Sequence, residues 1–178
     1  MHWNFQNTYT QLPKIYYTEN IQPENIKNPK LTIFNEDLAN KLNLKINNNE
    51  KKICNFLLGK NTNNKNFFSQ AYAGHQFGQF TILGDGRALI LGEHINNNNE
   101  RFDIQLKGSG KTPYSRNGDG KAVLGPMIRE YLLSEAMYYL GISSTRALAV
   151  ISTGEKVKRD ILENGAILVR VAKSHIRV

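Results

Sequence analysis

The chain has 178 residues, of which 40% are hydrophobic and 21% are charged, and its net charge is +8. This composition suits one domain, or one lobe of a larger one, and excludes a chain that is disordered throughout. The longest apolar runs are far too short to span a membrane, and the first residues lack the pattern of a signal peptide. A single cysteine, Cys54, excludes an internal disulfide and a multi-cysteine zinc site. We therefore predict a cytoplasmic protein without a membrane partner.

The positive charge suggests a polyanionic partner, which can be a nucleic acid or a nucleotide held by its phosphates. Much of the lysine lies in the Asn/Lys-rich stretches 45–52 and 60–65, which are typical of solvated loops. An RNA-binding domain has only this charge in its favour, because the chain lacks the interleaved aromatic platform of single-strand binders. We expect no nucleic-acid partner.

Short Asn-rich clusters separate the predicted elements in the first half of the chain. Residues 36–44 and 50–58 are predicted to form short helices, the second ending at Gly59. Residues 72–78 read as a turn flanked by glycines. After it, residues 80–83 and 88–93 are predicted as two strands of a hairpin that turns at 84–86.

The second half of the chain predicts a third strand at 102–106, followed by a glycine-rich loop at 108–121. A helix is expected from Pro126 to Gly141, with a buried stripe made of Ile128, Leu132, Ala136 and Leu140. Residues 145–152 and 166–172 are predicted as two further strands. The fold class is therefore α+β, with a hairpin-rich antiparallel sheet and one prominent helix packed on it.

Candidate chemistry begins at the turn Gly84-Asp85-Gly86-Arg87. Glycine lets backbone amides approach a phosphate closely, and the adjacent Arg87 adds a positive, forked donor. Taken alone, the pattern more often marks only a hairpin. It is not a dinucleotide fingerprint, because a strand and not a helix follows it, and the chain contains no P-loop.

Lys107 ends the third predicted strand, and Glu130 lies in the first turns of the next helix. A strand lysine paired with a helix glutamate is the arrangement that holds nucleotide phosphates in kinases. The alternative for Lys107 is an ordinary solvated surface charge. The order of the glycine turn, the lysine and the glutamate favours a phosphate site.

The glycine-rich loop and the last strand add further candidates. The loop combines glycines, hydroxyls and basic side chains, so it suits phosphate binding, although a mobile linker is the alternative. Arg170 lies on an otherwise apolar strand, where an unpaired charge would be costly. It is therefore expected to meet an anion, which is either a ligand or an internal carboxylate.

Several long segments closely resemble the SelO (selenoprotein O, or YdiU) family of protein adenylyltransferases, namely 72–78, 83–87, 106–116, 118–124, 128–131, 134–137, 145–149, 169–172 and 174–177. The resemblance implies a protein-kinase-like N-terminal lobe that binds ATP, with Mg²⁺ or Mn²⁺ as the metal. It implies transfer of AMP to Ser, Thr or Tyr hydroxyls of protein substrates. The implied nucleotide contacts are Gly84, Gly86, Arg87, Lys107, Asp119, Gly120, Arg170 and Arg177, with Glu130 pairing with Lys107.

In this family the catalytic base and the metal ligands come from a further, C-terminal lobe. Residues 1–178 are therefore expected to be the N-terminal portion of such a catalytic domain, with no catalytic or metal-binding residue of its own and no activity alone. A separately encoded C-terminal part is a candidate partner. The alternative is a truncated or degenerate remnant that binds nucleotide weakly or not at all.

Overall fold

The computed structural model describes residues 1–46, 48–60, 62, 66–76 and 78–176. Its strands are β1 (Tyr17–Glu19), β2 (Lys30–Phe34), β3 (Phe68–Gln76), β4 (Gln79–Gly84), β5 (Ala88–Ile95), β6 (Arg101–Lys107), β7 (Arg146–Lys158) and β8 (Leu162–Ala172). The helices are α1 (Glu36–Lys41), α2 (Glu50–Leu57) and α3 (Leu124–Tyr139), with two 3₁₀ turns, η1 (Tyr9–Gln11) and η2 (Lys14–Tyr16). Among the described residues, no helix is both long enough and apolar enough to cross a membrane.

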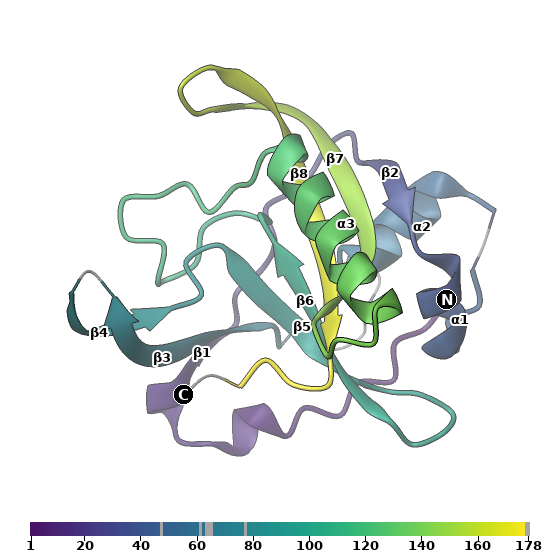
Figure 1. The fold of residues 1–178 in the computed structure, drawn as a ribbon, viewed down its shortest axis with the longest axis horizontal. Helices are drawn as coiled ribbons and strands as arrows, with labels where there is room; N and C mark the ends of the chain where they lie inside the picture. Colours follow the sequence, from purple (N-terminus) through teal and green to yellow (C-terminus); the bar gives the residue numbers. More distant parts are fainter. Residues whose placement is uncertain (47, 61, 63–65, 77, 177–178) are drawn as a thin grey trace.

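The strands form one sheet in the order β1-β3-β5-β6-β8-β7-β2, and β4 pairs with β3 beside this path. Every described strand pair is antiparallel. Figure 1 shows α3 lying across β7 and β8, near the end of the sheet that β2 closes. A mostly antiparallel sheet with few helices confirms the predicted α+β class. Its likeness to a protein-kinase lobe stays an expectation.

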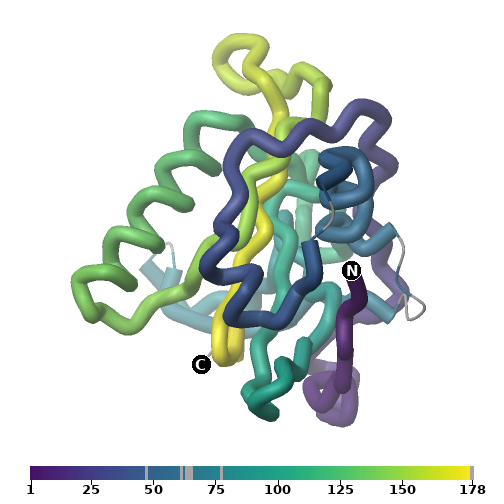
Figure 2. The backbone as a smooth tube through the Cα atoms, turned by 90° about the vertical axis from the view of Figure 1, so that its right-hand side faces the viewer, coloured from purple at the N-terminus to yellow at the C-terminus, as the bar shows by residue number. Residues whose placement is uncertain are grey.

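One face of the sheet carries the main hydrophobic core. Side chains alternate between the two faces of a strand, so the odd-numbered residues of β8 and the even-numbered residues of β6 point the same way. Ile167, Val169, Phe102, Ile104 and Leu106 all join this core. Helices α1 and α2 cover it, and Figure 2 shows them on the opposite side of the sheet from α3.

The opposite face is only partly apolar. There α3 packs on β7 and β8 through a second cluster, which consists of Ala122, Met127, Ala147, Val150, Ala166 and Leu168. The neighbouring positions on this face are polar, because the alternation that buries Ile104 and Leu106 turns Gln105 and Lys107 away from the main core. The site described below lies on this polar part of the sheet.

Local sequence signals account for the helix ends. Asn35 and Asn49 precede α1 and α2, and each side chain accepts a hydrogen bond from a backbone amide in the first helical turn. Gly59 and Gly141 follow α2 and α3 with φ angles of 73° and 77°, a conformation that glycine adopts without strain. The predicted ends of these two helices are confirmed.

The predicted buried stripe of α3 is wrong. Ile128 is half-buried, but Leu132, Ala136 and Leu140 are exposed. The helix instead buries Met127 and Glu135. The helix has apolar side chains on two faces. The sheet packs against the face that holds Met127 and the buried carboxylate of Glu135, and not against the face that holds Leu132 and Leu140.

The predicted hairpin across 84–86 is also wrong, because β4 pairs with β3 while β5 pairs with β6 and, at one position, with β3. Residues 84–86 thus link two strands, β4 and β5, that are not described as partners of each other. The segment predicted as a turn is largely strand, since residues 72–76 belong to β3 and pair with β4. Phe77, in the same segment, lies outside the described residues.

Candidate functional site

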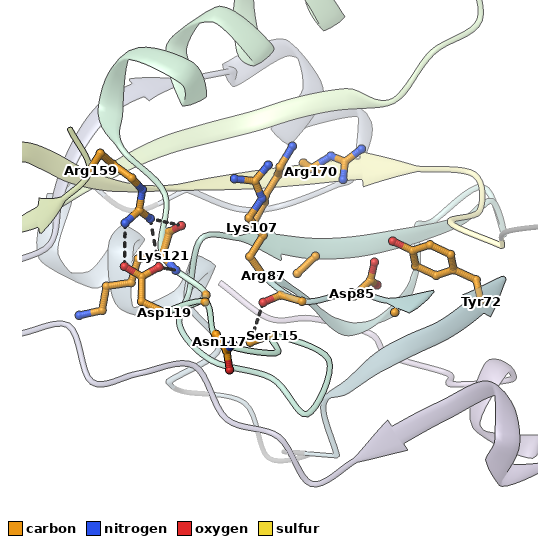
Figure 3. Close-up of a pocket in the computed structure, with 15 residues that line it drawn as sticks. Tyr72, Asp85, Arg87, Lys107, Ser115, Asn117, Asp119, Lys121, Arg159 and Arg170 are labelled. Atoms are coloured by element: carbon orange, nitrogen blue, oxygen red, sulfur yellow. Dashed lines mark hydrogen bonds and ion pairs between the residues drawn. The ribbon is translucent and has the colours of Figure 1, made fainter. Parts of the chain in front are cut away.

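A cavity of about 720 Å³ opens on the polar part of the sheet. Its walls come from the end of β4, the β4–β5 link, β6, β8, the glycine-rich loop and the β7–β8 turn (Figure 3). Seven of the residues singled out from the sequence line it, namely Gly84, Gly86, Arg87, Lys107, Asp119, Gly120 and Arg170. Arg177 lies outside the described residues.

Three cationic side chains gather in this cavity. Arg87 is exposed on the β4–β5 link, Lys107 ends β6, and Arg170 lies on β8. Residue 105 is the register partner of Arg170, so Lys107 lies two residues further along the same strand face. Figure 3 shows the three side chains grouped together.

Glu130 of α3 joins two of these cations. Its Oε2 lies 2.5 Å from Nζ of Lys107, and its Oε1 lies 3.2 Å from Nε of Arg170. All three side chains are largely shielded from solvent. The anion that Arg170 meets within this chain is therefore an internal carboxylate. Two positive charges share one carboxylate, so the group retains net positive charge toward the cavity.

At the other side of the cavity, Asp119 is held by Arg159 from the β7–β8 turn. Arg159 Nη1 and Nη2 donate to the two carboxylate oxygens at 2.8 and 3.0 Å, and Lys121 N donates to Oδ1 at 2.9 Å. Arg159 above all holds the pKa of Asp119 below its ordinary value. This forked pair ties the glycine-rich loop to the β7–β8 turn.

Packing within this chain accounts for the glycines of the cavity. A Cβ on Gly84 would lie 2.2 Å from the ring of Tyr114, and one on Gly86 would lie 2.7 Å from the Tyr114 carbonyl oxygen. Gly120 has a φ of 67°, and a Cβ there would lie 2.0 Å from the carbonyl oxygen of Gly110. These glycines are needed to seat the loop, whether or not a ligand approaches them.

The cavity also contains Tyr72 and Arg159, which sequence reasoning missed as site residues, and Ser115, Asn117 and Lys121 of the loop predicted to suit phosphate binding. Arg159 lies 40 residues from its partner Asp119, so only the charged character of its turn hinted at it. Lys121 forms ion pairs with Glu24 and Glu155, at 3.2 and 3.1 Å. Hence each of the two cations near Asp119 has a carboxylate partner, whereas Lys107 and Arg170 share the single carboxylate of Glu130.

A second groove, of about 450 Å³, lies between α3 and strands β7 and β8. Glu130 and Arg170 line it together with apolar residues such as Leu133 and Met137, so it adjoins the cation group from the helix side. Within the described part of the chain, no group of three or more His, Cys, Asp and Glu side chains could hold a metal ion.

A cavity of this size, lined by cations and a glycine-rich loop, has the dimensions and charge that suit a polyanionic ligand of small-molecule size. The family model described as "Protein adenylyltransferase SelO" matches residues 1–178. The chain belongs to this family, which confirms the resemblance seen in its motifs.

Relatives of this chain carry the name "Protein nucleotidyltransferase YdiU". The protein from Pelagibacter ubique is 56% identical over 178 residues, which are 99% of this chain and 37% of the relative. Those from Brevibacillus brevis and Clostridium perfringens are 57% and 55% identical over 99% of this chain, and 36% of each relative is covered. The chain thus spans little more than a third of the length of these relatives.

Proposed function

We propose that the cavity binds ATP and that the chain provides this nucleotide site to a protein adenylyltransferase. The observation that carries the proposal is the grouping of Arg87, Lys107 and Arg170 in one cavity whose volume lies within the range of about 300–1,000 Å³ usual for small-molecule sites. Family membership supports the same reading, since the relatives are named nucleotidyltransferases.

The three cations would bind the triphosphate. In AMP transfer an acceptor oxygen attacks the α-phosphorus, the bond from that phosphorus to the oxygen bridging toward the β-phosphorus breaks, and pyrophosphate leaves. Negative charge grows on the departing pyrophosphate, so Lys107, Arg170 and Arg87 would stabilise it by preorganised charge. Glu130 would orient Lys107 and Arg170 without touching the nucleotide. The acceptors in this proposal are Ser, Thr or Tyr hydroxyls of proteins.

A divalent metal, Mg²⁺ or Mn²⁺, would neutralise further phosphate charge. The carboxylates near the cavity do not suit such an ion by themselves, because Asp119 is engaged by Arg159 and Glu130 by Lys107 and Arg170. Asp85, which also lines the cavity, is buried and accepts hydrogen bonds from the Gln105 side chain and the Gln70 amide. No step is therefore assigned to a metal bound by the described residues. The expectation that the 178-residue chain transfers no AMP by itself stays a prediction.

The proposal is tested by calorimetric titration of the 178-residue chain with ATP and with adenosine. Each charge-assisted bond to phosphate is worth about 1.5–3 kcal/mol, so Lys107→Ala or Arg170→Ala should weaken ATP binding by about 10- to 150-fold. Adenosine binding should change less than about twofold, because it carries no phosphate. Lys173→Ala serves as the control, since Lys173 is ion-paired with Glu100 away from this cavity.

Equal losses for ATP and adenosine would show that Lys107 and Arg170 do not contact phosphate. Failure of the unmodified chain to bind ATP would contradict the proposal and favour the alternative of a remnant without nucleotide affinity. Unfolding curves measured for each variant separate loss of binding from loss of structure. The Lys107–Glu130 pair is partly exposed, and Glu130 keeps Arg170 as a partner when Lys107 is removed. Lys107→Ala should therefore lower the free energy of unfolding by only about 1 kcal/mol.

A further inference from the structure

Gln105 is a fully buried amide beside the cavity that no part of the proposed function uses. It lies on β6 opposite Arg170 of β8 and has no exposed surface. Its Oε1 accepts a hydrogen bond of 2.6 Å from Nη1 of Arg170. Its Nε2 donates to Oδ2 of Asp85 at 3.5 Å, and the backbone amide of Gln70 lies 3.4 Å from the same oxygen. Asp85 is also buried.

The chemistry of the two neighbours determines how the Gln105 amide must point. A guanidinium can only donate hydrogen bonds, so the amide oxygen must face Arg170. The amide nitrogen then faces Asp85 and donates to it. Because a buried amide without partners is costly, this orientation is strongly preferred over the flipped one.

The hydrogen bond from Arg170 to the oriented Gln105 amide restrains the Arg170 side chain. Arginine has a long side chain whose freedom must be lost before it can bind a phosphate in one geometry. Glu130 attracts the guanidinium from the α3 side, at 3.2 Å from Nε. Gln105 holds Nη1 from the sheet side. The two contacts together keep the guanidinium at the boundary between β8 and α3, where Arg170 lines the cavity.

We propose that Gln105, oriented by Asp85, is a positioning residue that holds the Arg170 guanidinium ready for the triphosphate of the nucleotide. This inference rests on the proposed function, because it assigns Gln105 a role in binding the same ligand. Gln105 touches no ligand itself. It acts by preorganising a cation, which lowers the cost of ordering that side chain when the phosphate binds.

The first experiment needs no nucleotide. In the 178-residue chain labelled with ¹⁵N, the Nε–H signal of Arg170 is assigned by its loss in Arg170→Lys. We expect Gln105→Met, which keeps the length but removes the acceptor, to broaden or shift this signal. Gln105→Asn, whose shorter amide withdraws the oxygen, repeats the test if Gln105→Met fails to fold.

The second experiment is a double-mutant cycle on ATP affinity. Gln105→Met should weaken ATP binding about tenfold in the original chain, and less than about twofold when Arg170 is already Ala. Adenosine affinity should not change. Thr153→Val is the control, because Thr153 is a buried polar residue of β7 that does not line the cavity.

The outcomes separate this inference from the proposed function. An Arg170 signal that is the same in Gln105→Met and in the original chain overturns the inference, as do additive losses in the cycle. A chain that binds no ATP contradicts the proposed function, while the Arg170 signal still decides whether Gln105 positions the guanidinium.

Discussion

Gly84 shows how one residue seats the loop that surrounds the cavity. The ring of Tyr114 occupies the place of a side chain on Gly84, and the Tyr114 hydroxyl lies 2.9 Å from that of Thr18. Tyr114 is thereby held both at its ring and at its tip. Since Tyr114 belongs to the glycine-rich loop, this contact helps to set the loop against the end of β4.

Gly84→Ala is therefore expected to destabilise the chain by about 1–3 kcal/mol, because overpacking forces neighbouring groups to move. Gly74→Ala is the matched control, since Gly74 lies on the paired strand β3 and a Cβ there would contact nothing within 4 Å. The measurement is the free energy of unfolding in urea. A similar, small effect of both variants would contradict the packing role of Gly84.

At the scale of elements, a buried ion pair fastens α3 to the sheet. Glu135 accepts hydrogen bonds from Nε and Nη2 of Arg146 at 2.9 and 2.6 Å, and from the backbone amide of Ala147 at 2.9 Å. The Asn35 side chain also donates to it, at 2.7 Å, while capping α1. One carboxylate thus connects α3, β7 and the start of α1, so its loss should affect all three.

Glu135→Gln should cost about 3–5 kcal/mol at neutral pH, because it leaves Arg146 buried without its charge partner. Burial raises the pKa of Glu135, but Arg146, the Ala147 amide and Asn35 outweigh it and hold the pKa below the ordinary value of 4.5. The carboxylate therefore stabilises the fold above that ordinary pKa, and this contribution is lost as pH falls through the lower, folded pKa.

The check is urea unfolding at neutral and acidic pH. The original chain should lose more stability on acidification than Glu135→Gln does. Glu36→Gln is the control, because Glu36 is exposed on α1, and it should keep the pH dependence of the original chain. Identical pH dependence in all three proteins would show that Glu135 is not a source of the acid sensitivity.

At the scale of the whole molecule, α3 leaves an apolar face uncovered. Leu132, Leu133 and Leu140 are 57%, 63% and 74% exposed, and Met137, Tyr139 and Ile142 are exposed beside them. None of these residues belongs to the cluster that packs α3 on β7 and β8, and Leu140 and Ile142 lie just after the helix. Contiguous apolar surface of this kind promotes association.

We therefore expect the 178-residue chain to bind an apolar dye and to associate as its concentration rises. Replacing Leu132 and Leu140 by Gln should reduce dye binding and association without lowering the free energy of unfolding, since both side chains are exposed. The same replacements at Ile161 and Leu162, exposed at the β7–β8 turn, form the control. Sedimentation measures association, and a chain that stays monomeric without a dye signal would contradict this prediction.

Local patterns determined much of this protein from sequence. Short-range signals located the ends of α2 and α3, because the glycines after these helices act within a turn of the chain. The alternation in β6 likewise placed Lys107 at the end of a strand. Long motifs identified the family, which the family model confirms over residues 1–178.

Only the tertiary structure decided which elements meet. The local sequence predicted a hairpin between β4 and β5, whereas in the structure β4 pairs with β3 and β5 pairs mainly with β6. Periodicity does not choose between the two apolar faces of α3, because the choice depends on the partner that Glu135 finds in Arg146. The clamp of Arg159 on Asp119 and the contact of Gln105 with Arg170 join residues 40 and 65 positions apart. Such contacts arise from the folded sheet, which no short stretch of sequence encodes by itself.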